Sequence, residues 1–122
     1  HPALSLKGEG KVNEGKSAVS FIQDTVEKKA KEILAAQNLE KTLVILDPPP
    51  AGIHPKVRKA LMEHSPQHLF YVSCNPELTV RQDLPDFCQK YEITFAKAYD
   101  FFPHTDHYEA FFVLKKLPTA KI

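Results

Sequence analysis

The chain reads LFYVSCNP over residues 69–76, an apolar run that ends in a cysteine, an asparagine and a proline. A second apolar run, LVIL at residues 43–46, ends in Asp47 and three prolines. Short continuous apolar runs are typical of parallel strands that are covered on both faces. Pro48 forces Asp47 out of the helical region, so the second run is followed by a stiff extended loop. The two runs therefore predict neighbouring parallel strands of one sheet.

Helical patterns lie between these strands. Apolar residues recur at helical spacing over residues 25–37, where Thr25 is a candidate cap. Residues 55–64 begin with a proline that a first helical turn tolerates. Residues 77–91 are predicted as a helix that is interrupted or kinked at Pro85. This alternation predicts an α/β fold with right-handed crossovers.

The last two predicted strands, residues 93–101 and 110–116, run in opposite directions. They are joined by a loop of about eight residues, which is too short for a helical crossover. The returning strand therefore begins where the parallel strands end, which is the ligand-binding edge of open α/β sheets. We expect Glu109 to lie at this edge together with Asp47 and Cys74.

Length and composition limit the remaining possibilities. With 122 residues the chain is one domain, in which residues 1–17 are polar and hold three of the four glycines and so predict a loop or tail. A short strand is expected at residues 18–22. The net charge of +1 gives no argument for nucleic-acid binding. No apolar run approaches the roughly 20 residues of a membrane span, and two cysteines give no disulfide framework. These features predict a soluble, intracellular protein with reduced thiols, and the cytoplasm is the expected compartment.

Cys74 and Glu109 are the candidate reactive groups. A thiol at the end of a buried strand is held rigidly, and a helix that starts after Pro76 would favour the reactive thiolate. The alternatives are a buried, inert cysteine and a solvated glutamate at a strand end. A metal site built from His104 and His107 would need a third ligand such as Cys74. Histidines that hydrogen-bond within a turn explain the same pattern, so no metal is predicted.

Three segments together resemble the RNA uracil-5 methyltransferases. They are residues 46–49 (LDPP), 71–76 (YVSCNP) and 100–109 (DFFPHTDHYE), in the order and at the separations found in that family. Its members use S-adenosylmethionine to make 5-methyluridine in transfer or ribosomal RNA. The resemblance implies a partial Rossmann-like methyltransferase sheet with an antiparallel C-terminal strand pair. It also implies that residues 18–122 are the C-terminal half of a catalytic domain.

The resemblance also implies a role for each matching residue. Cys74 corresponds to the nucleophile that adds to C6 of uracil, and Glu109 to the base that removes the C5 proton. Asp47 corresponds to an aspartate near the cofactor. The target base would have to be flipped out of its stack to reach the thiol. The residues expected to contact the substrate are Pro48, Asn75, Phe102 and His104.

The chain departs from the family pattern in several places. Pro50 stands where an arginine is common, and Thr79 and Asp83 each come one position later than in the family. The glycine-rich cofactor turn and the N-terminal RNA-binding barrel are missing. We therefore expect a fragment that is inactive alone and whose exposed apolar surface favours self-association. Two other functions stay open: an RNA cytosine-5 or amino-group methyltransferase, and a non-catalytic RNA-binding or scaffold module.

Overall fold

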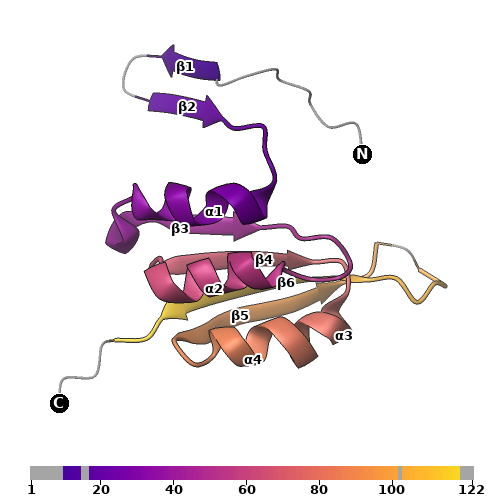
Figure 1. Ribbon diagram of the computed structural model, residues 1–122. Helices are drawn as coiled ribbons and strands as arrows, with labels where there is room; N and C mark the ends of the chain where they lie inside the picture. The colour runs from indigo at the N-terminus through magenta and orange to yellow at the C-terminus, as the bar shows by residue number, and fades with distance from the viewer. Residues whose placement is uncertain (1–9, 15–16, 102, 119–122) are drawn as a thin grey trace.

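A four-stranded mixed sheet forms the centre of the protein (Figure 1). The computed structural model describes residues 10–14, 17–101 and 103–118. The strand order is β3-β4-β6-β5, where β3 is parallel to β4 and β6 is antiparallel to both β4 and β5. The strands are β3 (Leu43–Leu46), β4 (His68–Ser73), β5 (Tyr91–Tyr99) and β6 (Glu109–Lys116). The predicted α/β fold with an antiparallel C-terminal pair is confirmed.

Helix α1 spans Val26–Ala35 and is followed by the 3-10 turn η1 (Leu39–Lys41), which leads into β3. The helix predicted at residues 25–37 is therefore present. Thr25 occupies the N-cap position, but its side chain makes no capping hydrogen bond. Thr25 therefore occupies the expected cap position with an extended backbone, but its hydroxyl does not cap the helix.

Helix α2 spans Pro55–His64 and lies between β3 and β4 in the chain. It begins with its proline in the first turn, where the His54 side chain accepts a hydrogen bond from the Lys56 amide. It ends at Ser65, which has a left-handed backbone with φ of 50°. The helix predicted at residues 55–64 is therefore confirmed.

The segment after β4 is a helix of three parts. A first turn, α3 (Pro76–Leu78), leads into a five-residue π-helical segment, η2 (Thr79–Asp83), and then into α4 (Leu84–Phe87). The sequence predicts the irregularity at Pro85, but Pro85 lies in the first turn of α4, where a missing amide is tolerated. The irregularity precedes it, in η2.

A hairpin precedes the sheet. Strand β1 (Gly10–Glu14) pairs with β2 (Ser17–Phe21), and Val12 lies opposite Val19. The short strand predicted at residues 18–22 is present. The loop predicted for residues 1–17 is wrong over β1, because glycines are rare in strands and the prediction gave them more weight than the pairing with β2. Residues 1–9 and 15–16 lie outside the described ranges.

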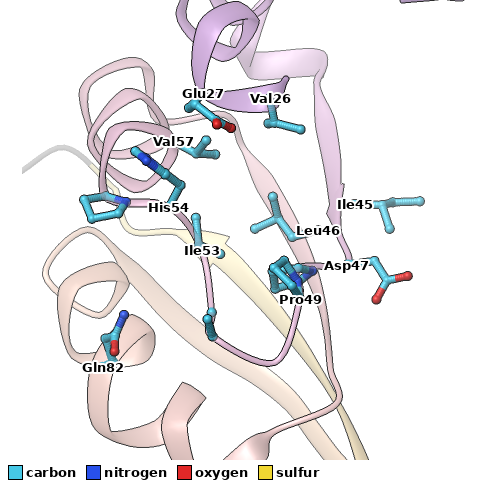
Figure 2. A pocket seen from close by; sticks show the side chains of 14 residues that line it. Val26, Glu27, Ile45, Leu46, Asp47, Pro49, Ile53, His54, Val57 and Gln82 are labelled. Atoms are coloured by element: carbon cyan, nitrogen blue, oxygen red, sulfur yellow. The ribbon is translucent and has the colours of Figure 1, made fainter. Parts of the chain in front are cut away.

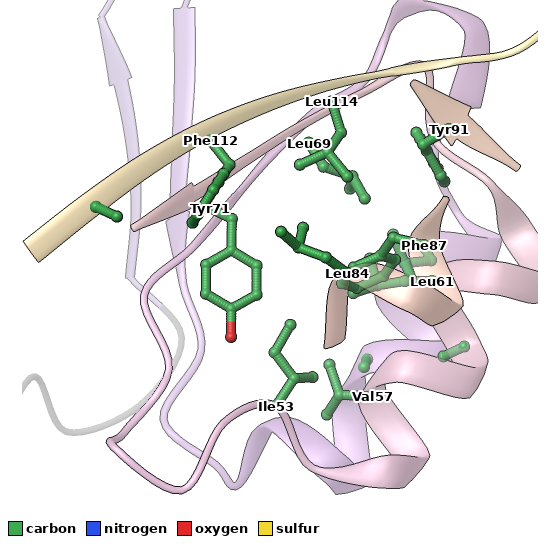
Figure 3. Packing of buried hydrophobic residues seen from close by; sticks show 14 residues of the cluster. Ile53, Val57, Leu61, Leu69, Tyr71, Leu84, Phe87, Tyr91, Phe112 and Leu114 are labelled. Carbon is green, nitrogen blue, oxygen red and sulfur yellow. The ribbon is translucent and has the colours of Figure 1, made fainter. Parts of the chain in front are cut away.

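The core lies between the sheet and the helices (Figure 3). Buried side chains of β4 and β6 form one core with those of α2 and α4, and α1 packs against α2. The core includes Leu61, Leu69, Tyr71, Leu84, Phe87, Phe112 and Leu114. The opposite face is open in the described part of the chain, where Ile45 is 66% exposed and Phe95 is 45% exposed. The expectation of strands covered on both faces is therefore not met. Among the described helices none is long and apolar enough to cross a membrane.

Candidate active site

Cys74 and Glu109 lie at the same end of two neighbouring strands. In the antiparallel pairing of β4 and β6, Ser73 lies opposite Ala110, so Cys74 and Glu109 are the next positions outward. Both line one pocket of about 290 Å³. Cys74 is exposed and carries a free thiol, whereas Glu109 is half-buried. The structure thus brings the two residues together at the edge that the strand directions predict.

Hydrogen bonds hold the loop that carries Cys74. The Asn75 amide donates to Ser73 Oγ over 3.2 Å, and Asn75 Nδ2 donates to the Pro50 carbonyl oxygen over 3.2 Å. The Thr79 amide donates to the Asn75 carbonyl oxygen over 3.1 Å, and Pro76 starts α3. These bonds fix the backbone on the C-terminal side of Cys74, and they also join its loop to the loop after β3.

A larger pocket of about 560 Å³ lies after β3 (Figure 2). Its lining is mainly apolar and includes Val26, Ile45, Leu46, Pro48, Ile53 and Val57. Asp47 is exposed and lies at one margin of the pocket, with its carboxylate pointing away from Ile53. The sequence predicts one site at the sheet edge. The structure instead has two pockets there, with Asp47 and Pro48 at the larger one and Cys74 and Glu109 at the smaller one.

The loop before β6 supplies the remaining lining of the smaller pocket, namely Thr105, His107 and Tyr108. His104 is exposed, has a left-handed backbone with φ of 69° and does not line this pocket. Phe102 lies outside the described residues. Within the described ranges, no group of three or more His, Cys, Asp or Glu side chains could hold a metal ion.

A buried polar network connects the segments that carry the two pockets, and no pattern in the sequence indicates it. The Asp83 side chain is 0% exposed and accepts hydrogen bonds from the Tyr71 hydroxyl, Arg58 and the Ile53 amide. Burial raises the pKa of the Tyr71 phenol well above its ordinary value, and the bond to Asp83 raises it further. Tyr71 is therefore a neutral donor at physiological pH.

The fold is an open α/β domain with pockets at the carboxyl edge of its sheet, which is where domains of this class bind their ligands. Its fold is similar to that of a methyltransferase: the crystal structure of Pyrococcus abyssi tRNA (uracil-54, C5)-methyltransferase in complex with S-adenosyl-L-homocysteine matches with a TM-score of 0.54 and 44% identity, over 59% of this chain and 18% of that one. The chain belongs to the tRNA (uracil-5-)-methyltransferase family, whose profile matches residues 17–117.

Curated relatives agree with this family. An uncharacterized RNA methyltransferase from Caldanaerobacter subterraneus subsp. tengcongensis is 39% identical, over 93% of this chain and 24% of its own length. The tRNA (uracil(54)-C(5))-methyltransferase of Pyrococcus furiosus is 45% identical, over 61% of this chain and 18% of its own length. A 23S rRNA (uracil(747)-C(5))-methyltransferase from Shewanella is 40% identical, over 61% of this chain and 18% of its own length. The chain thus spans about a quarter or less of the length of these relatives.

Proposed function

We propose that the protein containing this chain methylates C5 of uridine in RNA, with S-adenosylmethionine as the methyl donor. The observation that carries the proposal is the shared pocket of Cys74 and Glu109, a thiol and a carboxylate on adjacent strands. The names of the relatives support an RNA uracil substrate. The S-adenosyl-L-homocysteine bound to the Pyrococcus abyssi enzyme supports the cofactor.

The larger pocket suits part of such a cofactor. Its volume of about 560 Å³ is in the usual range of small-molecule sites, and a mainly apolar lining with few polar groups is typical of them. We assign Asp47 and the neighbouring backbone to cofactor contacts. When bound, the cofactor supplies the methyl group that becomes attached to C5.

In the proposed mechanism, the Cys74 thiolate adds to C6 of uracil and forms a carbon–sulfur bond. This addition makes C5 an enolate-like nucleophile, which would attack the methyl carbon of the bound cofactor; the carbon–sulfur bond to that methyl group would break and S-adenosylhomocysteine would leave with its electron pair. Glu109 then accepts the C5 proton. The electrons of the C5–H bond restore the C5–C6 double bond, the carbon–sulfur bond breaks, and the thiolate of Cys74 leaves.

The substrate base would enter the smaller pocket from outside the RNA stack. A base inside a helix cannot reach the thiol, so the target uridine must be flipped out. We assign Pro48, Asn75, Phe102 and His104 to substrate contacts. Phe101 is 63% exposed, and its ring stacks on Tyr99 with 5.7 Å between the centroids. The exposed Phe101 ring, held by the half-buried Tyr99 next to the pocket loop, offers a surface for an unstacked RNA base.

We also propose that residues 18–122 are the C-terminal half of a catalytic domain and are inactive alone. The described part of the chain pairs β3 only with β4, and Ile45 in β3 is 66% exposed, so an unpaired strand edge and apolar surface favour self-association. Because the proposed mechanism needs a reduced thiol, we place the protein in the cytoplasm. We also expect this chain alone to bind S-adenosylmethionine weakly, which micromolar binding by calorimetry would contradict. A monomer at high concentration by light scattering would contradict self-association.

The test is a methylation assay of the full-length protein on transfer and ribosomal RNA transcripts, with the nucleosides identified by mass spectrometry. We expect 5-methyluridine from the wild-type protein and none from Cys74→Ala. Cys88→Ala is the matched control, since Cys88 is also an exposed free thiol but lines neither pocket; it should retain activity. Formation of 5-methylcytidine or of an N-methylated base would indicate an RNA cytosine-5 or amino-group methyltransferase instead. RNA binding without any product would indicate a non-catalytic module.

A further inference from the structure

Asp83 is the most completely buried acidic side chain in the described part of the protein. It is 0% exposed and accepts from three donors: the Tyr71 hydroxyl at 2.5 Å, Arg58 Nη1 at 2.8 Å and the Ile53 amide at 3.2 Å. A carboxylate without water around it depends on such donors, because an unpaired buried charge is strongly destabilising. Its three partners are therefore held in fixed positions relative to one another.

These partners belong to the segments that form the pockets. Ile53 ends the loop of residues 47–53, which carries Asp47 and lines the larger pocket. Tyr71 lies in β4, three positions before Cys74. Arg58 lies in α2, and it also binds the exposed Asp86 carboxylate over 2.7 Å. One side chain thus joins the backbone of the loop at residues 47–53 to the strand that presents the thiol.

Further hydrogen bonds extend this connection to the residue next to Cys74. Thr79 Oγ1 lies 3.4 Å from the Tyr71 hydroxyl and 2.6 Å from Ser73 Oγ. Ser73 Oγ in turn accepts from the Asn75 amide over 3.2 Å. Both Ser73 and Thr79 are buried. A continuous series of polar contacts therefore runs from Asp83 to the peptide just beyond the thiol.

Two backbone features allow Asp83 to occupy this place. Gly52 has a φ of +90°, and a Cβ there would lie 3.2 Å from Asp83 Oδ2, so a side chain at position 52 would be strained and crowded. The π-helical segment η2 ends at Asp83. A π turn holds one residue more than an α turn, so η2 changes the direction in which the Asp83 side chain leaves the helix, and the carboxylate lies in the core.

We propose that Asp83 is a positioning residue. It holds the loop of residues 47–53 against the Cys74 loop, so that the distance between the two pockets stays fixed. The inference rests on the proposed function, because that separation matters when the methyl group and the C5 atom must meet. Asp83 lines neither pocket and contacts no reacting atom, so it acts through Ile53 and Tyr71. Misplacement of reacting groups by about 1 Å can lower a rate by roughly 100-fold.

The test compares Asp83→Asn with Asp86→Asn in the full-length protein. Both variants remove a carboxylate that binds Arg58, but Asp86 contacts neither Ile53 nor Tyr71 in the described network. Asparagine keeps the shape of Asp83 but turns an NH2 group toward its donors. We expect kcat to fall by roughly 10- to 100-fold in Asp83→Asn, with the KM for RNA changed by less than about threefold. Asp86→Asn should keep the wild-type kcat.

Amide hydrogen exchange in this chain provides a readout that does not require activity. In Asp83→Asn the protection of the Ile53 and Asn75 amides should fall by about 10-fold, whereas Asp86→Asn should leave both unchanged. Tyr71→Phe, which keeps the buried ring, is the second variant. It should lower kcat and the protection of the two amides by less than Asp83→Asn does.

The outcomes separate the two proposals. Wild-type kcat in Asp83→Asn or in Tyr71→Phe, or equal loss of kcat in Asp83→Asn and Asp86→Asn, would overturn the positioning role. If the wild-type protein itself transfers no methyl group, the proposed function fails. In that case the exchange of Ile53 and Asn75 alone decides whether Asp83 holds the two loops together, and unchanged protection would contradict it.

Discussion

The two pockets at the carboxyl edge of the sheet lie after neighbouring parallel strands, yet they differ in what they offer a ligand. The pocket after β4 holds about 290 Å³ and brings together the thiol of Cys74 and the carboxyl group of Glu109. The pocket after β3 holds about 560 Å³ and is built of prolines and aliphatic side chains, with Asp47 at its margin. In the proposed function, the smaller pocket holds the reacting base and the larger one part of the cofactor.

The difference arises from the segment after each strand. Prolines after Asp47 keep the chain extended, so the loop forms a wall. After Cys74 a helix starts at once, and β6 returns beside β4, so a second reactive strand end lies next to the first. The proposed division of roles between the two pockets would therefore follow from topology, and it can be tested by changing one pocket at a time.

The largest effect is expected for Glu109→Gln in the smaller pocket. Loss of a general base should lower turnover in the full-length protein by about 10²- to 10⁴-fold, while cofactor binding stays unchanged. Because the thiol can still add to C6, a covalent complex with ordinary RNA should accumulate, which denaturing gel electrophoresis detects. Glu92→Gln on β5 is the control, since Glu92 is exposed and lines neither pocket. Normal turnover in Glu109→Gln would contradict the assignment of the smaller pocket as the site of proton removal.

Asp47→Asn tests the larger pocket. The Kd for S-adenosylmethionine, measured by calorimetry on the full-length protein, should rise by about 10-fold because a charged hydrogen-bond acceptor is lost. Alkylation of Cys74 by iodoacetamide should proceed at the wild-type rate. Glu63→Gln on α2, whose carboxylate lies outside both pockets, should change neither quantity. A slower alkylation of Cys74 in Asp47→Asn would mean that the pockets are not separate in function.

Tyr71 is buried in β4 and lines neither pocket, and it should make the stability of this chain sensitive to alkaline pH. Its pKa is raised above the ordinary value of 10.0 by burial and by Asp83, so its contribution is fully present below about pH 10 and is lost as the pH rises toward the folded-state pKa. In Tyr71→Phe the free energy of unfolding should be lower by about 1 kcal/mol at neutral pH and should decline less steeply above about pH 10. Urea unfolding at several pH values measures both; an unchanged alkaline slope would contradict the assignment.

The smallest effect on stability is expected for Ile45→Ala, at the wall of the larger pocket. Ile45 is 66% exposed, so the free energy of unfolding should change by less than about 0.5 kcal/mol. Leu69→Ala on the adjacent strand is the contrast, because Leu69 is 0% exposed and its truncation should destabilise the fold by about 2–5 kcal/mol. Urea unfolding measures both changes. A large loss of stability in Ile45→Ala would mean that the open face of the sheet contributes to the stability of the fold.

Much of the fold can be predicted from local patterns. The apolar runs at residues 43–46 and 69–73 are strands, Pro55 starts a helix, and the short loop before Glu109 makes the last pair antiparallel. These features depend on neighbouring residues, which is why the sequence predicts them. Strand direction places Cys74 and Glu109 at the same edge of the sheet, and the pairing of β6 with β4 brings them into one pocket.

The remaining features depend on contacts between distant residues. Ile53 and Asp83 are 30 positions apart, and no periodicity reveals that this aspartate lies inside the core. The helical pattern after Pro76 is visible in the sequence, but the π-helical turn at Thr79–Asp83 within it is not. The separation of Asp47 from the smaller pocket is likewise set by how the loop at residues 47–53 packs.

The most direct test is to trap the reaction on RNA that contains 5-fluorouridine. The full-length protein is incubated with this RNA and S-adenosylmethionine, digested, and the modified peptide is sequenced by mass spectrometry. Fluorine cannot be removed as a cation, so the thiol should stay bound to C6, and we predict one adduct, on Cys74, carrying the transferred methyl group. Absence of an adduct, or an adduct on Cys88 in its place, would contradict the assignment of Cys74 and Glu109 as the reactive pair.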